Sequence, residues 1–309
     1  MNQLALWPPS IRDMWGGAGS ASTIPLTSSV IACSVPLSFY TSFWINALSP
    51  VGGAVALLSL LIVRKVQSKR WKWRSYRGAV LVVSFLLYPT VSRSVLQMLS
   101  CRTVGDKSLL VADYSVDCDT ATHTLNTIAA LLILAIFCVG FPVACAVVLY
   151  RRQAAGRLYD TNTRKEFLFL SDGYAPRACW WESVVTLRKF ALVAVADGLA
   201  AATKPHRAAV SMLVLVAALV LHIAFKPYPS RSQGHLETAS LAVVSLSLWL
   251  GLLFSLSPVS AGAEVLVIVI LFAANGGFVA WVVLLAAKRA WYSGAPAAVV
   301  SHLNIVKGL

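Results

Sequence analysis

Long apolar runs, separated by short polar and basic stretches, make up most of this chain. Each run has about 18 to 25 residues, and at about 1.5 Å per residue a helix of that length crosses a hydrocarbon core of about 30 Å. No pattern of short alternating segments indicates a membrane barrel, which leaves helices to satisfy the backbone in lipid. The sequence therefore predicts an all-α polytopic transmembrane bundle of about seven spans, at 45–63, 78–98, 126–149, 183–202, 208–225, 238–256 and 263–287.

The composition supports the same class, because 58% of the 309 residues are hydrophobic and only 12% are charged. An ordinary soluble domain is less apolar than this. We expect a flexible non-cytoplasmic segment at 1–42, a transmembrane helical domain at 43–290 and a cytoplasmic tail at 291–309. The first segment lacks the charged and apolar regions of a cleavable signal peptide.

Orientation follows from the basic residues, which gather in alternate connections. Loops rich in Lys and Arg stay in the cytoplasm, so the N-terminus is predicted outside and the C-terminus inside. The net charge of +14 then reflects attraction to anionic lipids of the cytoplasmic leaflet rather than to nucleic acid. We expect an integral protein of the plasma membrane or an endomembrane. The basic residues lie mainly at 64–77, 151–177, 226–231 and 288–307.

Two cysteines, Cys101 and Cys118, bracket an acidic connection after the second predicted span. This connection lies on the non-cytoplasmic face, where disulfides form, and we expect these two cysteines to pair. Its aspartates solvate an exposed loop or, alternatively, attract cations to a membrane mouth. The remaining cysteines are interpreted as small apolar fillers, and no metal site is predicted.

Charged residues inside predicted spans are candidate functional groups, since an unpaired charge in lipid costs at least about 2.5 kcal/mol. Arg93 and Asp197 each lie about five residues from the outer end of a span, by the prediction above. This matched depth suggests an interhelical ion pair, although each side chain alone could also reach the headgroups.

A second group stands at the inner end of the fourth predicted span. These residues frame a cytoplasmic joint or, alternatively, form an interfacial tryptophan belt with snorkelling charges. His222, near the inner end of the fifth predicted span, is a packed interfacial histidine or a proton switch. The proposed joint consists of Trp180, Trp181, Glu182, Arg188 and Lys189.

The last predicted span carries Asn275, Gly276 and Gly277 near its midpoint. A polar residue beside two glycines would suit a hinge or a pore-facing patch. Alternatively, small residues there let helices approach closely.

Several motifs resemble the polytopic C-terminal region of transient-receptor-potential-like membrane proteins of fungi, algae and other protists. That resemblance implies a cation channel or channel-related protein, in which a long ectodomain usually precedes the membrane region. The motifs are LYPTVSRSVLQMLSCRTVG (87–105), an L-x-x-D-x-S-x-x-C run (110–118) followed by His123, VGFP (139–142), FLSDGYAPRACWWESVVTLRK (169–189), FKPY (225–228) and HLETASL (235–241).

The sequence departs from the usual design of such channels in two places, one bearing on voltage gating and the other on a tetrameric pore. The fifth predicted span has no arginine ladder, and the SPVSAG connection at 257–262 is too short for a re-entrant pore helix and filter. Phosphate-binding, metallohydrolase and nucleophile-elbow motifs are also absent, so we expect neither an enzyme nor a cofactor.

Three functions therefore remain: a cation channel or relative that is not voltage-gated, a seven-span receptor, and a structural or assembly subunit. The lipid bilayer is a partner in all three cases. A channel would also bind cations and could assemble with further copies of the chain.

Overall fold

The computed structural model describes residues 37–68, 73–158, 160–171, 173–199, 202–256 and 261–294, and these are mostly helical. The first helix, α3 (Phe39–Ser68), begins before the predicted start of the first span, and the last, α11 (Ala261–Gly294), extends past its predicted end. The predicted domain boundaries after residues 42 and 290 therefore fall inside helices. Most of the predicted N-terminal segment and of the tail lies outside the described residues.

Six helical segments of the described chain are long and apolar enough to cross a membrane. The predicted span at 183–202 is a helix but does not belong to these six: α8 (Trp181–Val193) and the π-helix η5 (Ala194–Gly198) carry Glu182, Arg188, Lys189 and Asp197 within 18 residues. The prediction of about seven spans is thus corrected to six apolar helices and one shorter charged rod. The six are α3, α4 (Trp73–Met98), the continuous rod of α5 (Ala121–Ile133), η3 (Leu134–Gly140) and α6 (Phe141–Ala154), α9 (Lys204–Phe225), α10 (Arg231–Leu256) and α11.

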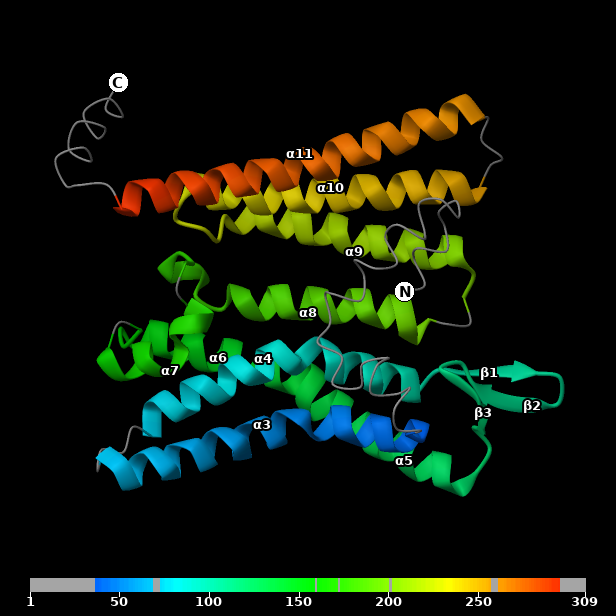
Figure 1. Ribbon diagram of the computed structural model, residues 1–309, viewed down its shortest axis with the longest axis horizontal. Coiled ribbons are helices and arrows are strands. Elements are labelled where there is room, and N and C mark those ends of the chain that lie inside the picture. The colour runs from blue at the N-terminus through cyan, green and yellow to red at the C-terminus, as the bar shows by residue number, and fades with distance from the viewer. Residues whose placement is uncertain are drawn as a thin grey trace.

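The long helices and the α8–η5 rod lie side by side along one axis (Figure 1). Helix α4 packs against α3, α5, α7 (Thr161–Ser171) and α8, while α10 joins α9 to α11 at the edge of the molecule. Helix α7, which was predicted as part of a connection, lies at the opposite end from the sheet. The short 3₁₀ turn η4 (Pro176–Ala178) leads from α7 into α8.

A small antiparallel sheet, which the sequence did not predict, extends from one end of the helices (Figure 1). Strands β1 (Cys101–Val104), β2 (Lys107–Leu110) and β3 (Asp113–Asp117) pair in that order, with Cys101 opposite Leu110. Gly105 makes the first turn at φ 62°, a left-handed conformation that suits glycine. The sheet therefore occupies the predicted disulfide loop.

The core is concentrated around α4, and the outermost helices contribute little to it. Within the most apolar window of α4, 39% of residues are buried, against 6% for α3 and for α11. Val91, Val95 and Met98 of α4 pack with Phe43 of α3 and Ala130 of α5. The outer faces of α3 and α11 are apolar and remain exposed on the isolated chain.

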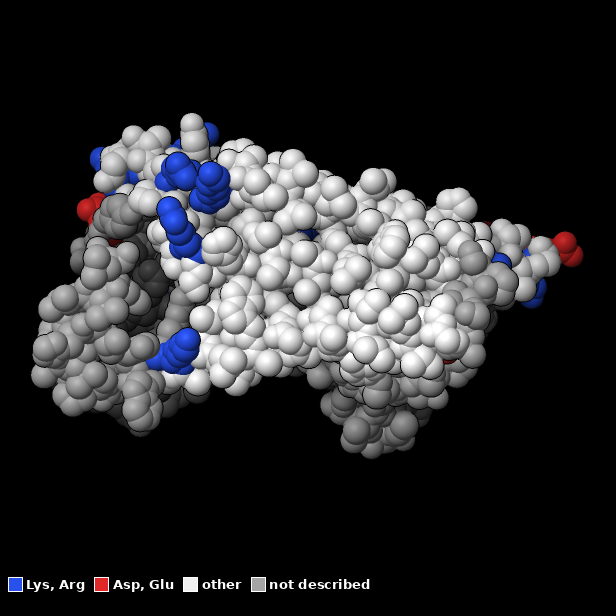
Figure 2. All heavy atoms as spheres, turned by 90° about the horizontal axis from the view of Figure 1, so that it is seen from above, with Lys and Arg blue, Asp and Glu red and all other residues white. Residues whose placement is uncertain are grey.

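This exposed apolar surface is typical of a protein whose solvent is lipid. Ile136 is 71% exposed and Leu213 is 69% exposed, and burying such a side chain away from water is worth about 1.5 to 3 kcal/mol. Figure 2 shows a broad uncharged surface, with basic side chains gathered at one end and charges of both signs at the far tip. The chain is therefore an integral membrane protein by its long apolar helices and by this surface.

Two π-helices interrupt the α-helices, and side chains of α4 and of the loop after it donate hydrogen bonds to their carbonyls. Such a segment displaces the regular i→i−4 hydrogen bonds. The hydroxyl of Tyr88 donates to the carbonyl of Cys138 in η3, and Ser100 Oγ donates to the carbonyl of Asp197 in η5 at 2.6 Å. Both widened turns are thereby fixed against α4.

We expect Tyr88→Phe to destabilise the folded protein, because the Cys138 carbonyl then loses its buried donor. The cost should be about 1 to 3 kcal/mol, measured as the free energy of unfolding in mixed micelles. Tyr150→Phe is the matched control, since Tyr150 is 61% exposed. Equal effects of the two variants would show that the Tyr88 hydroxyl has no special role.

Candidate functional site at the basic end

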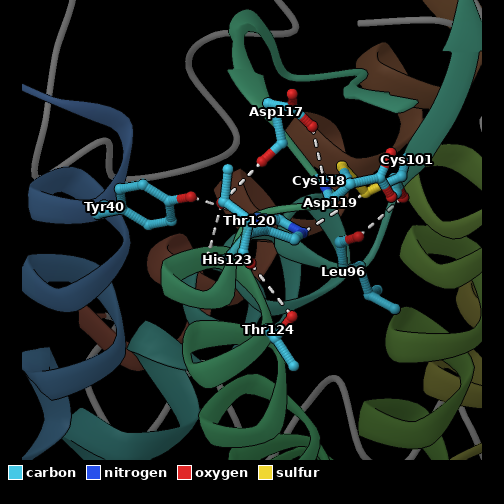
Figure 3. The surroundings of a disulfide bond; sticks show 10 residues. Tyr40, Leu96, Cys101, Asp117, Cys118, Asp119, Thr120, His123 and Thr124 are labelled. Carbon is cyan, nitrogen blue, oxygen red and sulfur yellow. Dashed lines mark hydrogen bonds between the residues drawn. A yellow bond between two sulfur atoms is a disulfide. The ribbon is translucent and has the colours of Figure 1, made fainter. Parts of the chain in front are cut away.

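The sheet end of the molecule is closed by the predicted disulfide between Cys101 and Cys118 (Figure 3). Closing a loop of this length stabilises the fold by about 3 kcal/mol on the chain-entropy model. His123 of α5 places Nε2 3.5 Å from Cys101 Sγ and Nδ1 3.4 Å from the Tyr40 hydroxyl of α3. The disulfide, α5 and α3 thus meet at this histidine, which appeared in a motif but received no predicted role.

Cys101, Cys118 and His123 do not form a metal site while the disulfide is intact. The ligand atoms of Cys101, Cys118 and His123 lie within 4.8 Å of one another, but the two sulfurs are bonded to each other and neither is a thiolate. The described free cysteines, Cys138, Cys145 and Cys179, are buried, as apolar fillers would be. Burial also raises the pKa of the Cys179 thiol.

The structure brings Arg93 and Asp197 together near the same end. Arg93 Nε lies 3.3 Å from Asp197 Oδ2, and Nε makes no aligned hydrogen bond, so the contact is an electrostatic one. Arg207 at the start of α9 donates to the Ala196 carbonyl at 3.1 Å. Two arginines therefore neutralise the negatively polarised turn η5.

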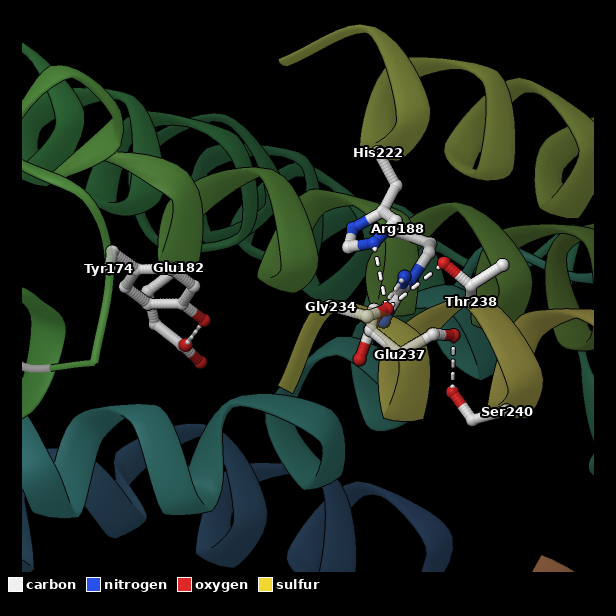
Figure 4. A network of polar contacts seen from close by, with 8 residues as sticks. All are labelled: Tyr174, Glu182, Arg188, His222, Gly234, Glu237, Thr238 and Ser240. Atoms are coloured by element: carbon white, nitrogen blue, oxygen red, sulfur yellow. Dashed lines mark hydrogen bonds and ion pairs between the residues drawn. The ribbon is translucent and has the colours of Figure 1, made fainter. Parts of the chain in front are cut away.

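At the opposite end, two of the predicted joint residues, Glu182 and Arg188, make separate polar contacts (Figure 4). Tyr174 donates to Glu182 at 2.6 Å, and Arg188 pairs with Glu237 of α10 at 2.7 Å. Glu182 and Arg188 thus bind different partners. Lys189 is exposed, and no contact of its side chain is described.

The two tryptophans pack inside this joint. Trp181 is 3% exposed, and its ring centroid lies 5.8 Å from Phe225 and 6.4 Å from His222. Trp180 packs edge-on against the same Phe225 at 5.7 Å. This packing fits a structural joint better than a tryptophan belt at the headgroups, since a belt residue faces the interface.

The connection between α9 and α10 is held at both sides of the joint. The Pro227 carbonyl accepts a hydrogen bond from the Ala175 backbone at 2.7 Å. His222 Nε2 lies 3.2 Å from the Gly234 carbonyl, which requires the proton on Nε2 because a carbonyl only accepts. His222 is 5% exposed, and its ring lies 6.4 Å from that of Trp181.

A further buried carboxylate lies at the same end, and no sequence pattern predicted it. Glu166 of α7 is 6% exposed and pairs with Arg77 of α4 and with Arg152 of α6, whose Nη2 lies 3.4 Å away. Arg152 also donates to Thr163 and stacks on the Phe167 ring. A carboxylate between two guanidinium groups ties α4, α6 and α7 together at the basic end.

The α9–α10 connection borders a cleft of about 490 Å³. Lys226, the C-cap of α9, adopts a left-handed conformation at φ 43° and is the one non-glycine residue with positive φ among the described residues. Glycine usually occupies this position, and another residue there costs about 1 kcal/mol. The cleft is lined by His222, Ile223, Lys226, Pro227, Tyr228, Pro229, Ser230, Arg231, Gly234, His235 and Thr238.

In the last predicted group, within α11, the asparagine makes side-chain contacts and the two glycines do not. Asn275 Nδ2 donates to Ser247 Oγ of α10 at 3.2 Å and to the Leu271 carbonyl at 2.9 Å. A Cβ added at Gly276 or Gly277 would meet nothing within 4 Å. The glycines therefore do not mediate a close helix contact within the described chain.

Comparison with known proteins gives one distant relative. Over 179 residues, the chain is 28% identical to cysteine repeat modular protein A of Toxoplasma gondii, a match that covers 54% of this chain and 6% of that protein. No family model and no solved structure matches. The chain is thus an integral membrane protein with partial similarity to a small part of a much longer protein.

We expect removal of one partner from the Arg188–Glu237 pair to destabilise the joint, because each side chain is about four-fifths buried. Glu237→Gln should cost about 1.5 to 3 kcal/mol, and a double-mutant cycle with Arg188→Gln should show coupling of at least about 0.5 kcal/mol. Glu264→Gln is the control, since Glu264 has no described contact with α8. Strictly additive effects would contradict a specific pair.

Alkaline pH should loosen the joint. Burial, reinforced by Glu182 for Tyr174 and by Glu237 for Tyr228, raises the pKa of both phenols. The unfolded chain loses these protons at about pH 10, so stability is intact below that pH and falls as pH rises above it towards the folded pKa. Between about pH 8 and about pH 11, the melting temperature should fall less for the Tyr174→Phe/Tyr228→Phe double variant than for wild type. An equal fall in both proteins would contradict a role of these two phenols.

Proposed function

We propose that the chain is the membrane domain of a channel-related protein of the transient-receptor-potential-like type that is not voltage-gated. In this proposal α3 to α9 form a fixed frame, and the pair α10–α11 belongs to the conduction path, which second copies of the chain would complete. The sequence resemblance supplies the prior expectation, and the arrangement of the last two helices supports it.

The observation that carries the proposal is the polar contact between α10 and α11. Ser247 and Asn275 meet within the apolar spans of these two helices, where a polar side chain without a partner is costly. Leu250 and Leu271 pack beside them. Because α11 contacts chiefly α10 and stays largely exposed, it is free to meet another copy at the level of Asn275.

Two features restrict the mechanism. Helix α10 ends at Leu256 and α11 begins at Ala261, so any path is lined by helices rather than by a re-entrant loop. The basic residues of α9, Lys204 and Arg207, lie in its first turn, and a sensing ladder across the membrane field needs several charges. Voltage gating is therefore not part of the proposal.

The test is cation flux into liposomes that contain the purified protein. We expect Asn275→Leu to lower flux by at least tenfold, because an apolar side chain removes the polar group at the middle of the path. Val279→Leu, one turn further along the same helix, should leave flux unchanged. Native-like melting must be shown for both variants.

A second candidate is a membrane anchor of a large assembly, and the comparison favours considering it. The matched part of the Toxoplasma protein is only 6% of its length, so this type of domain accompanies a much larger protein there. Absence of flux from folded wild-type protein under several ionic and redox conditions would exclude conduction and favour the anchor.

A further inference from the structure

The cleft at the α9–α10 connection is strongly basic. Lys226, Arg231 and His235 are exposed at its edge. None of the residues that line it is acidic. Glu237, which lies in α10 between the lining residues His235 and Thr238, is paired with Arg188. The cleft therefore offers positive charge that the described residues around it do not neutralise.

Its position places it at the boundary between the apolar surface and the basic end. The apolar segment of α9 ends at Phe225, and that of α10 begins at Arg231. Ile223 lines the cleft and is 54% exposed, and Phe225 beside it is 46% exposed. A ligand in this cleft would have its charged part among basic groups and an apolar part along α9.

The backbone of Lys226 is held in an unfavourable left-handed conformation. Glycine would fit its left-handed conformation without strain, yet the chain places a long cation there. A lysine elsewhere in the last turn would complement the helix dipole as well. The rings of Pro227 and Pro229 fix their own φ angles just after Lys226. The Pro227 carbonyl also accepts a hydrogen bond from Ala175, so the strained lysine lies on a rigid turn.

We propose that this cleft binds the phosphate headgroup of an anionic phospholipid from the leaflet at the basic end. The ammonium of Lys226 and the guanidinium of Arg231 would contact the phosphate oxygens, and the free backbone N–H groups in the first turn of α10 would add donors. The acyl chains would run along Ile223 and Phe225. This site is independent of conduction.

The experiment compares lipid retention by four forms of the full chain. Protein from vesicles of equal phosphatidylglycerol and phosphatidylcholine is released into neutral detergent, and bound lipid is counted by native mass spectrometry. Wild type should retain mainly phosphatidylglycerol. Lys226→Gly and Arg231→Gln should each lower the ratio of retained phosphatidylglycerol to phosphatidylcholine by roughly fivefold. Lys288→Gln, an exposed lysine of α11 outside the cleft, is the matched control.

Lys226→Gly also separates binding from folding. It removes the charge and relieves the backbone, so its melting temperature in neutral detergent should equal or exceed that of wild type while retention falls. An equal loss of retention in Lys288→Gln would overturn the proposal in favour of general surface charge. Unchanged retention in Lys226→Gly and Arg231→Gln would overturn it as well.

A last arm distinguishes a lipid from a soluble phosphate compound. Glycerol phosphate, which carries the headgroup chemistry without acyl chains, should fail to displace retained phosphatidylglycerol at concentrations comparable to that of the lipid. Displacement at such concentrations would assign the cleft to a soluble ligand and overturn the lipid assignment. Because no arm measures ion flux, this proposal and the proposed function can fail separately.

Discussion

The absence of water from the hydrocarbon core governs this structure, because every polar group placed there must find a partner inside the protein. Helices satisfy most backbone groups, but the π-helices η3 and η5 disturb that regular bonding. Tyr88 and Ser100 supply donors to their carbonyls, and Arg207 supplies another. Helix α4 and the loop that follows it provide two of these three donors, which explains why the most buried helix is also the one that organises its neighbours.

The two ends of the molecule are held together by different sets of contacts. At the sheet end, besides the Arg93–Asp197 pair, a disulfide and His123 join the strands to α3 and α5. At the basic end, ion pairs and aromatic packing do the corresponding work, since Glu166 joins α4, α6 and α7 while Glu237 joins α10 to α8. The cleft lies at that end as well, and the carbonyl of its Pro227 accepts a hydrogen bond from the backbone of Ala175. A lipid bound there would consequently contact the same turn that positions α10.

Hydropathy alone located the six long apolar helices, because burying apolar area in lipid depends on local sequence. Compartment and cysteine position together predicted the Cys101–Cys118 disulfide, and matched depth in the membrane suggested Arg93 and Asp197, which the structure places 3.3 Å apart. The small sheet was missed because its strands have four or five residues each and lie in a polar loop. Helix α7 and the role of Glu166 were missed because both depend on contacts between elements, with Arg77 of α4, 89 residues away, and with Arg152 of α6, 14 residues away.

The rod of α8 and η5 shows most clearly why a charged segment can still lie in an apolar bundle. Alone, its Arg188 and Asp197 would each cost at least about 2.5 kcal/mol in lipid, and the rod is therefore not one of the six apolar helices. Inside the bundle, Arg188 meets Glu237 of α10 and Asp197 meets Arg93 of α4. Neither pair can form until α8 lies between its neighbours, so the free energy of placing this rod belongs to the assembled bundle and not to the rod itself.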